Sequence, residues 1–265
     1  MKRAVKGLFA NFGLEISKLK PKYEKTRFST PYEVALLTLL SEKKRLRIAQ
    51  VGANDGAVDD PLHNFVSLAT DQTEICLIEP QQHLIPYLTK NYEFHPSKAI
   101  FNGAVGVRGE LELYVVKQSY WSRLHVPYAK GWPEYSAPSG VTSSDRNHVR
   151  KWLEQYLKKG NDIDDAIDVL RVPSLPLPDI LQSLGILGEI DVLQVDTEGF
   201  DDQIIYNSDI GALKPQLINF EAKHLPAKRY DELKIFLRDH GYLIARWQGD
   251  ALAIQMAAAG ALNLS

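Results

Sequence analysis

From residue 30 onward, segments with the helical spacing of apolar residues alternate with short apolar runs, and this alternation limits the folds open to the chain. The runs that resemble strands are LRIAQVGA, EICLIEP, AIFNGAVG, IDVLQVD and PQLINFEAK, and GELELYVVK is expected to be an extended partner of the third one. Alternating elements of this kind predict an α/β fold with a mostly parallel sheet and helices on both faces. The final stretch YLIARWQGDALAIQ predicts an antiparallel hairpin around Gly249 and Asp250.

The composition supports one sizeable core. The chain has 265 residues, of which 45% are apolar and 24% charged, and a net charge of −2 that gives it no general attraction for nucleic acid. Its single cysteine, Cys76, excludes an internal disulfide framework and suits a reducing compartment, so we expect a cytoplasmic protein. No apolar run approaches 18 residues, and no small-residue cleavage site follows the N-terminal stretch GLFANFGL, so we expect neither a membrane span nor a signal peptide.

We divide the chain into a basic N-terminal segment (1–29) and one folded domain (30–265). Residues 1–27 hold eight Lys or Arg against two Glu. The segment is interpreted as a solvated basic helix, and weak contact with an anionic membrane surface is the alternative. The sequence does not indicate an oligomeric state.

Residues 117–172 interrupt the alternation and are rich in Trp, Tyr, Pro, Ser and Gly. They are too long for an ordinary connection, so we expect a lid or a substrate-binding insertion. Within them SSDRNHVRKWLEQYLKK predicts a capped helix. The candidate substrate residues are Trp121, Ser143, Asp145 and His148. Trp121, Tyr128, Trp132 and Tyr135 would either stack against a sugar or ring substrate or pack the insertion onto the sheet.

The first strand is followed by a loop, GANDG, that holds Gly52, Asn54, Asp55 and Gly56. A strand, a glycine loop and a helix beginning at Asp60-Pro61 let the backbone approach a ligand closely. The loop lacks the lysine of a P-loop, and Asp55 would repel the pyrophosphate of a dinucleotide. S-adenosylmethionine, which carries positive charge and no phosphate, fits this loop.

Carboxylates follow the second and fourth strands. Glu79 can accept hydrogen bonds from both ribose hydroxyls, although a nicotinamide enzyme would use an acid in the same place. Behind the fourth strand stand Asp196, Glu198, Asp201 and Asp202, and such crowding requires a cation, a metal or a shared proton among them. The last two are attributed to the first turn of the next helix, where the helix dipole favours acids.

Taken together, QVGANDG with DPL, LIEP, SGVTSSDRNHV, IDVLQVDTEGFD and KPQLINFEAKHL resemble the FkbM family of S-adenosylmethionine-dependent methyltransferases, over about residues 46–254. DTEGFD is the most specific of these motifs. The resemblance implies a class I methyltransferase, Rossmann-like fold whose seven-stranded sheet has an antiparallel last strand. It also implies methyl transfer, commonly to a hydroxyl of a sugar, a glycan or a secondary metabolite. Gln50 stands where many members carry an acid, and Asp55 or Asp196 would compensate.

The resemblance also implies roles for individual residues. The expected cofactor-binding residues are Gly52, Asn54, Asp55 and Gly56 at the methionine and ribose, Glu79 at the ribose hydroxyls, Asn102 and Ala104 at the adenine, and Asp196 at the amino-acid end or the reacting oxygen.

A hydroxyl acceptor must lose its proton, so the site also needs a base. The candidates are His224, Glu221, Glu198 and, within the insertion, His148. His224 has the most suitable ordinary pKa for this task. A metal-assisted variant stays open, because Asp196, Glu198, Glu221 and His224 would suit Mg²⁺ or Mn²⁺, but no ligand spacing requires it. A non-catalytic cofactor-binding module and a nicotinamide-dependent oxidoreductase are the rival functions.

Overall fold

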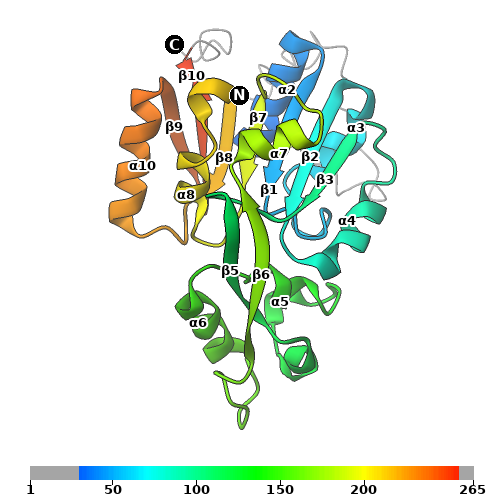
Figure 1. The fold of residues 1–265 in the computed structure, drawn as a ribbon, viewed down its shortest axis with the longest axis vertical. Coiled ribbons are helices and arrows are strands. Elements are labelled where there is room, and N and C mark those ends of the chain that lie inside the picture. The colour runs from blue at the N-terminus through cyan, green and yellow to red at the C-terminus, as the bar shows by residue number, and fades with distance from the viewer. Residues whose placement is uncertain (1–29, 257–265) are drawn as a thin grey trace, which may run out of the picture.

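The computed structural model of the protein describes residues 30–256, so the basic segment 1–29 and its expected membrane contact lie outside the described residues. A seven-stranded sheet in the order β3-β2-β1-β7-β8-β10-β9 forms the centre (Figure 1). Its strands are β1 (Leu46–Val51), β2 (Thr73–Glu79), β3 (Lys98–Asn102), β7 (Val192–Val195), β8 (Leu217–Glu221), β9 (Tyr242–Trp247) and β10 (Asp250–Gln255). The first five pair in parallel, whereas β10 is antiparallel to both β8 and β9. The predicted sheet and its antiparallel last strand are confirmed.

Helices cover both faces of this sheet, as predicted. The helices are α2 (Pro31–Lys43), α3 (His63–Leu68), α4 (Ile85–Asn91), α7 (Leu177–Ser183), α8 (Asp201–Tyr206), α9 (Ile210–Leu213) and α10 (Ala227–Asp239), with short 3₁₀ turns at η2 (Thr70–Gln72) and η3 (Gln82–Leu84). Along β2 the side chains alternate between the two cores: Ile75 packs with α2, α3 and α4, and Cys76 packs with α7, α8 and α10. Strands buried on both faces explain the continuous apolar runs in the sequence.

Local sequence explains where the first helices begin. Thr30 and Glu33 form a capping box at the start of α2, in which each side chain accepts a hydrogen bond from the other residue's backbone N–H. Asp60 accepts hydrogen bonds from the N–H groups of Leu62 and His63 at 2.7 and 2.8 Å. Asp60 therefore binds N–H groups at the start of the helix, but the helix begins at His63 with Leu62 as its N-cap residue, later than the sequence indicated.

A second, three-stranded sheet changes one expectation. It consists of β4 (Ala104–Val105), β5 (Gly109–Val116) and β6 (Ile167–Leu175), in the order β4-β6-β5. The segment GELELYVVK was expected to be the partner of the third strand, and this was wrong: β5 pairs antiparallel with β6. The sequence analysis did not predict β6, whose strand signal is weakened by Pro173 and the following Pro176.

Between β5 and β6 the chain forms a small structure with its own core. It contains η4 (Gln118–Arg123), η5 (Pro127–Ala129), α5 (Ser136–Gly140) and α6 (Arg146–Tyr156), and its buried apolar side chains are Val116, Tyr120, Val141, Val149, Leu153, Ala166 and Ile167. Figure 1 shows β5 and β6 projecting beyond one end of the main sheet and carrying α5 and α6. Asp145 caps α6 by accepting a hydrogen bond from the Asn147 N–H. We call residues 117–166 the insertion, and its action as a lid or substrate-binding part stays a prediction.

No helix within residues 30–256 has the length and apolar character needed to cross a membrane. The cytoplasmic location expected from the single cysteine stays a prediction.

Candidate functional site

The loop after β1 depends on a glycine, Gly52, for its backbone conformation and close packing. Gly52 has a φ of +80°, and a Cβ built on it would lie 1.8 Å from the backbone oxygen of Asp196. A glycine is therefore needed here because the backbone at Asp196, just after β7, packs against it. The same position also leaves space for a ligand. Asn54 also has a left-handed φ, +49°, which directs its backbone N–H to the carboxylate of Glu79.

Glu79, the last residue of β2, is buried and is bonded through both oxygens. Oε2 accepts a hydrogen bond from the Asn54 N–H, and Oε1 accepts one from the Gln81 N–H, each at 2.8 Å. Burial raises the pKa of Glu79 to about 7, although these two N–H groups oppose the shift. Oε1 also accepts a hydrogen bond of 3.3 Å from Gln81 Nε2, so the lone pair that stays free for a ligand is on Oε2.

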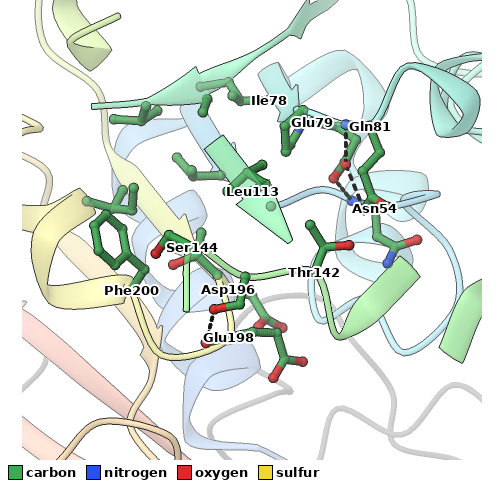
Figure 2. Close-up of a pocket in the computed structure, with 18 of the residues that line it drawn as sticks. Asn54, Ile78, Glu79, Gln81, Leu113, Thr142, Ser144, Asp196, Glu198 and Phe200 are labelled. Carbon is green, nitrogen blue, oxygen red and sulfur yellow. Dashed lines mark hydrogen bonds between the residues drawn. The ribbon is translucent and has the colours of Figure 1, made fainter. Parts of the chain in front are cut away.

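A narrow cavity of about 80 Å³ lies at the carboxyl ends of β1, β2 and β7. Its wall is mostly apolar, with Ile78, Val105, Leu113 and Phe200, and its polar groups come from Asn54, Glu79, Gln81, Ser143 and Asp196. In Figure 2, Asn54, Glu79 and Gln81 gather on one side of this pocket, and Asp196 and Glu198 lie at another. Gly52 and Ala104, two of the expected cofactor-binding residues, also line it.

One wall of the narrow cavity comes from the insertion. Residues 139–144 close it, and Gln81 holds them by donating a hydrogen bond of 3.1 Å from Nε2 to the carbonyl of Ser139. Ser143 donates from Oγ to the backbone oxygen of Glu198 at 3.3 Å. Ligand pockets usually measure roughly 300–1,000 Å³. The narrow cavity alone is therefore smaller than a cofactor-sized ligand needs.

A second cleft, of about 830 Å³, lies between the insertion and the main sheet. It is lined by the aromatic side chains of Tyr128, Trp132, Trp152 and Tyr156, and by Asp145, His148 and His224. The two cavities meet, because Asn54, Gly140, Asp196 and Glu198 line both. The predicted substrate residues Asp145 and His148 thus face the wide cleft, whereas Ser143 faces the narrow cavity.

Acidic residues at the carboxyl ends of β7 and β8 come together near this junction: Asp196, Glu198 and Glu221. Desolvation by the surrounding protein, followed by the nearby Glu221 and Glu198 carboxylates, raises the pKa of Asp196, although part of this residue is exposed to solvent. Burial, and secondarily Glu198, raises the pKa of Glu221 to about 8, although Glu221 forms an ion pair with Lys223. Glu221 lies behind the junction and lines neither cavity.

Two imidazoles flank the Glu198 carboxylate. His148 comes from α6 and His224 from the loop after β8, and the Nε2 atom of each lies 3.3 Å from Glu198 Oε2. The two rings meet edge to face with centroids 5.0 Å apart. Burial lowers the pKa of His224, against the opposing effect of Glu198, so its imidazole is neutral at pH 7. The sequence indicated all three residues as candidate bases, and the fold brings them next to one another.

Five predicted site residues do not line either cavity: Asp55, Gly56, Asn102, Trp121 and Glu221. Asp55 is buried and accepts hydrogen bonds from the N–H groups of Ala57 and Val58, so it shapes the loop. Gly56 makes room for Leu88 and Tyr92. The Asn102 side chain donates to the carbonyls of Glu79 and Pro80, and the Trp121 indole donates to the carbonyl of Val116.

Gln50 contacts a carboxylate, because it donates a hydrogen bond of 2.6 Å from Nε2 to Asp60 Oδ2, and both residues line the wide cleft. The compensation for the absent acid by Asp55 or Asp196 stays a prediction. Four residues that line the cavities were not indicated by the sequence: Gln81, Thr142, Trp152 and Tyr156. The two aromatic residues lie four apart on α6, and this spacing puts them on one helix face.

The strand order, the antiparallel β10 and the buried carboxylate at the end of β2 define a class I methyltransferase. The Methyltransferase FkbM domain matches residues 50–244 of the sequence. The chain belongs to this family of methyltransferases, and its cofactor is accordingly S-adenosylmethionine.

The chain also resembles solved structures at low identity. One is a precorrin-6y C5,15-methyltransferase from Geobacter metallireducens GS-15, with 13% identity, TM-score 0.39 and coverage of 87% of this chain and 91% of that one. Another is a fibrillarin pre-rRNA processing protein from Methanococcus jannaschii, with 12% identity, TM-score 0.40 and coverage of 91% and 86%. No curated protein matches the sequence. We take no substrate from these similarities.

Proposed function

We propose that the protein transfers a methyl group to a hydroxyl of a sugar, a glycan or a secondary metabolite, with the cofactor in the narrow cavity and the acceptor in the wide cleft. The observation that carries this proposal is the junction of the two cavities at Asn54, Gly140, Asp196 and Glu198. A transfer between two ligands needs such a shared boundary, because the reacting atoms must be held close and in line.

The residues of the narrow cavity fit the cofactor. Glu79 Oε2 keeps a lone pair for a ribose hydroxyl, and Asp196 supplies a carboxyl group to the amino-acid end, whose ammonium would favour its ionised form. Ile78, Val105 and Leu113 supply an apolar surface that suits adenine. When bound, S-adenosylmethionine supplies a methyl group to the acceptor oxygen, and the electron pair of the broken carbon–sulfur bond stays on sulfur.

The wide cleft suits an acceptor that carries both apolar faces and hydroxyls. Tyr128 is the centre of its aromatic group, because its hydroxyl accepts a hydrogen bond of 3.0 Å from Trp152 Nε1 and its ring meets Trp132 and Tyr156 edge to face. Aromatic rings bind the apolar faces of sugars and of ring compounds. Asp145, Lys151 and Gln155 line the same cleft and can hydrogen-bond to hydroxyls.

The acceptor proton needs a receiving group at the junction. A neutral His224 lines the wide cleft and can take this proton on its imidazole, and the Glu198 carboxylate beside Nε2 would stabilise the resulting imidazolium. His224 is therefore the base that we propose for the protein in the absence of a metal ion.

Calorimetry with S-adenosylmethionine and with NAD tests the cofactor assignment directly. We expect binding of S-adenosylmethionine alone, and binding of NAD instead would overturn the proposal in favour of the oxidoreductase alternative. Incubation with methyl-labelled cofactor and pools of glycans and small hydroxylated metabolites then tests catalysis. Label transferred to oxygen supports the proposal. Cofactor binding without transfer to any pool would favour a non-catalytic module.

A further inference from the structure

The group formed by His148, Glu198 and His224 lies at the inner end of the wide cleft. Three different parts of the fold contribute to it: α6 of the insertion, the loop after β7 and the loop after β8. One ligand atom from each residue lies within 4.8 Å of the others. The side chains of His148 and Glu198 are partly buried, with exposed fractions of 19% and 23%, and His224 is more exposed at 35%, so the group opens toward the cleft.

The distances fit an ion better than direct hydrogen bonds. Both imidazole nitrogens lie 3.3 Å from the same oxygen, Glu198 Oε2. A charge-assisted N–H···O bond is shorter, about 2.7–2.9 Å. An ion about 2.0–2.1 Å from each ligand in a tetrahedral arrangement separates the ligand atoms by roughly 3.3–3.4 Å. The spacing around Glu198 agrees with this second value.

The surroundings also favour a cation. Asp196, Glu198 and Glu221 bring ligand oxygens within 4.8 Å of one another. Lys223 pairs with Glu221 through Oε1, and Glu221 Oε2 is buried without a hydrogen-bond partner, 3.8 Å from His224 Nε2. Crowded carboxylates with an unsatisfied buried oxygen are costly unless positive charge lies nearby.

We propose that His148, Glu198 and His224 bind a divalent transition-metal ion, such as Zn²⁺ or Fe²⁺, which holds the acceptor oxygen in the cleft. Two imidazoles favour ions of this class over Mg²⁺, which prefers oxygen ligands. Three protein ligands and an open side leave a coordination position for a substrate oxygen. The inference rests on the proposed function, because the ion faces the cleft assigned to the acceptor.

The ion changes the role of His224. A nitrogen that binds the ion cannot also take the acceptor proton. The ion instead makes the bound hydroxyl more acidic, and its proton passes to water in the cleft. His148 then becomes as necessary as His224, whereas it is dispensable if His224 acts alone as the base.

The test uses full-length protein without an affinity tag, stripped with a chelator and titrated with Zn²⁺ by calorimetry and with Co²⁺ by visible absorption. We expect one equivalent of each to bind, and a Co²⁺ spectrum typical of nitrogen ligands. His148→Ala and His224→Ala should each weaken Zn²⁺ binding by about 100-fold or more. His125→Ala is the matched control, since this exposed histidine of the insertion lines neither cavity and should leave binding unchanged.

Calorimetry with S-adenosylmethionine on the same samples shows whether each variant is folded and separates the two proposals. If the variants bind the cofactor normally and the unchanged protein binds no Zn²⁺, the metal site is refuted and the proposed function stands. Zn²⁺ binding that survives in His148→Ala would also refute it. If S-adenosylmethionine fails to bind while Zn²⁺ binds as expected, the proposed function fails and the metal site stands.

Discussion

The hydroxyl of Tyr135 donates a hydrogen bond of 3.0 Å to Asp55 Oδ2 and so joins the insertion to the loop that follows β1. The ring of Tyr135 also stacks on Tyr87 of α4, with centroids 4.2 Å apart. This contact fixes the start of α5, the helix that leads into the wall of the narrow cavity. Movement of that wall must therefore loosen or work around the Tyr135–Asp55 contact.

Tyr135→Phe removes this hydrogen bond and keeps the ring. We expect the free energy of unfolding to fall by about 1 kcal/mol, and amide hydrogen exchange in residues 136–144 to become faster. Exchange followed by mass spectrometry is the measurement. Tyr87→Phe, which alters the stacked neighbour without touching the bond, should leave this segment unchanged. Equal protection in both variants would show that the bond does not hold the wall.

Glu79→Ala should weaken S-adenosylmethionine binding by roughly 1.5–3 kcal/mol, because hydrogen bonds to a charged acceptor are lost. Calorimetry measures this change. The control is Glu74→Ala, on the same strand, whose carboxylate pairs with Arg47 at 3.4 Å. An unchanged affinity in Glu79→Ala would remove Glu79 from the cofactor site.

Stability of the ligand-free protein should depend on the buried acids. The pKa values of Glu79 and Asp201 are raised to about 7 and that of Glu221 to about 8, chiefly by burial. Between about pH 4 and 8 the folded state holds protons that the unfolded chain has released, so these acids make the protein less stable as pH rises.

Urea unfolding between pH 5 and 8, in the presence of a chelator, measures this dependence. Glu221→Gln, which cannot ionise, should show a smaller fall in stability over this range than the unchanged protein. Glu112→Gln, at an exposed ion pair with Arg171, should retain the original fall. Parallel curves for the unchanged protein and Glu221→Gln would show that Glu221 does not titrate in this window.

His224→Ala and His224→Gln should each lower turnover by about 10²–10⁴-fold, the usual contribution of a positioned base, with cofactor affinity nearly unchanged. Since the pKa of His224 is lowered, the rate of the ion-free enzyme should reach its plateau below the pH expected of an ordinary histidine. His148→Ala decides between the two roles of His224. Normal turnover in this variant supports the base alone, and an equal loss supports the metal ion.

Gly52→Ala should cost about 3 kcal/mol of stability, because its Cβ meets the Asp196 carbonyl at 1.8 Å and its φ is +80°. Gly160→Ala provides the comparison, since φ is +88° there and no atom lies within 4 Å of the added carbon. It should cost only about 1–2 kcal/mol, the penalty of the backbone conformation. If thermal or urea unfolding shows the same loss of stability in Gly52→Ala and Gly160→Ala, the loop after β1 shifts to relieve the clash.

The parallel strands could be read from the sequence because both of their faces are buried. Ile48 and Ala49 face opposite cores, and each therefore had to be apolar. The position of Asp196 and Glu198 at the carboxyl edge of the sheet could be predicted for a related reason. Residues that follow parallel strands gather at that edge.

The remaining parts of the site depend on contacts between distant segments. Pairing of β6 with β5 decides where α6 lies, and so brings His148 to Glu198, 50 positions further along the chain. Asp55 looked like a ligand-binding charge, but its carboxylate completes the turn at Ala57 and Val58. Sequence pattern alone does not distinguish a carboxylate that serves the backbone from one that serves a ligand.

The register of β5 and β6 has a consequence for how this protein could diversify. Val116 and Ile167 are paired across the two strands, so the chain leaves for the insertion and returns from it at adjacent points. An inserted segment is tolerated best where its ends lie close together. The part that lines the wide cleft can thus be replaced as a cassette between two neighbouring residues. If the proposed function holds, related enzymes could in this way exchange acceptors while keeping one cofactor scaffold.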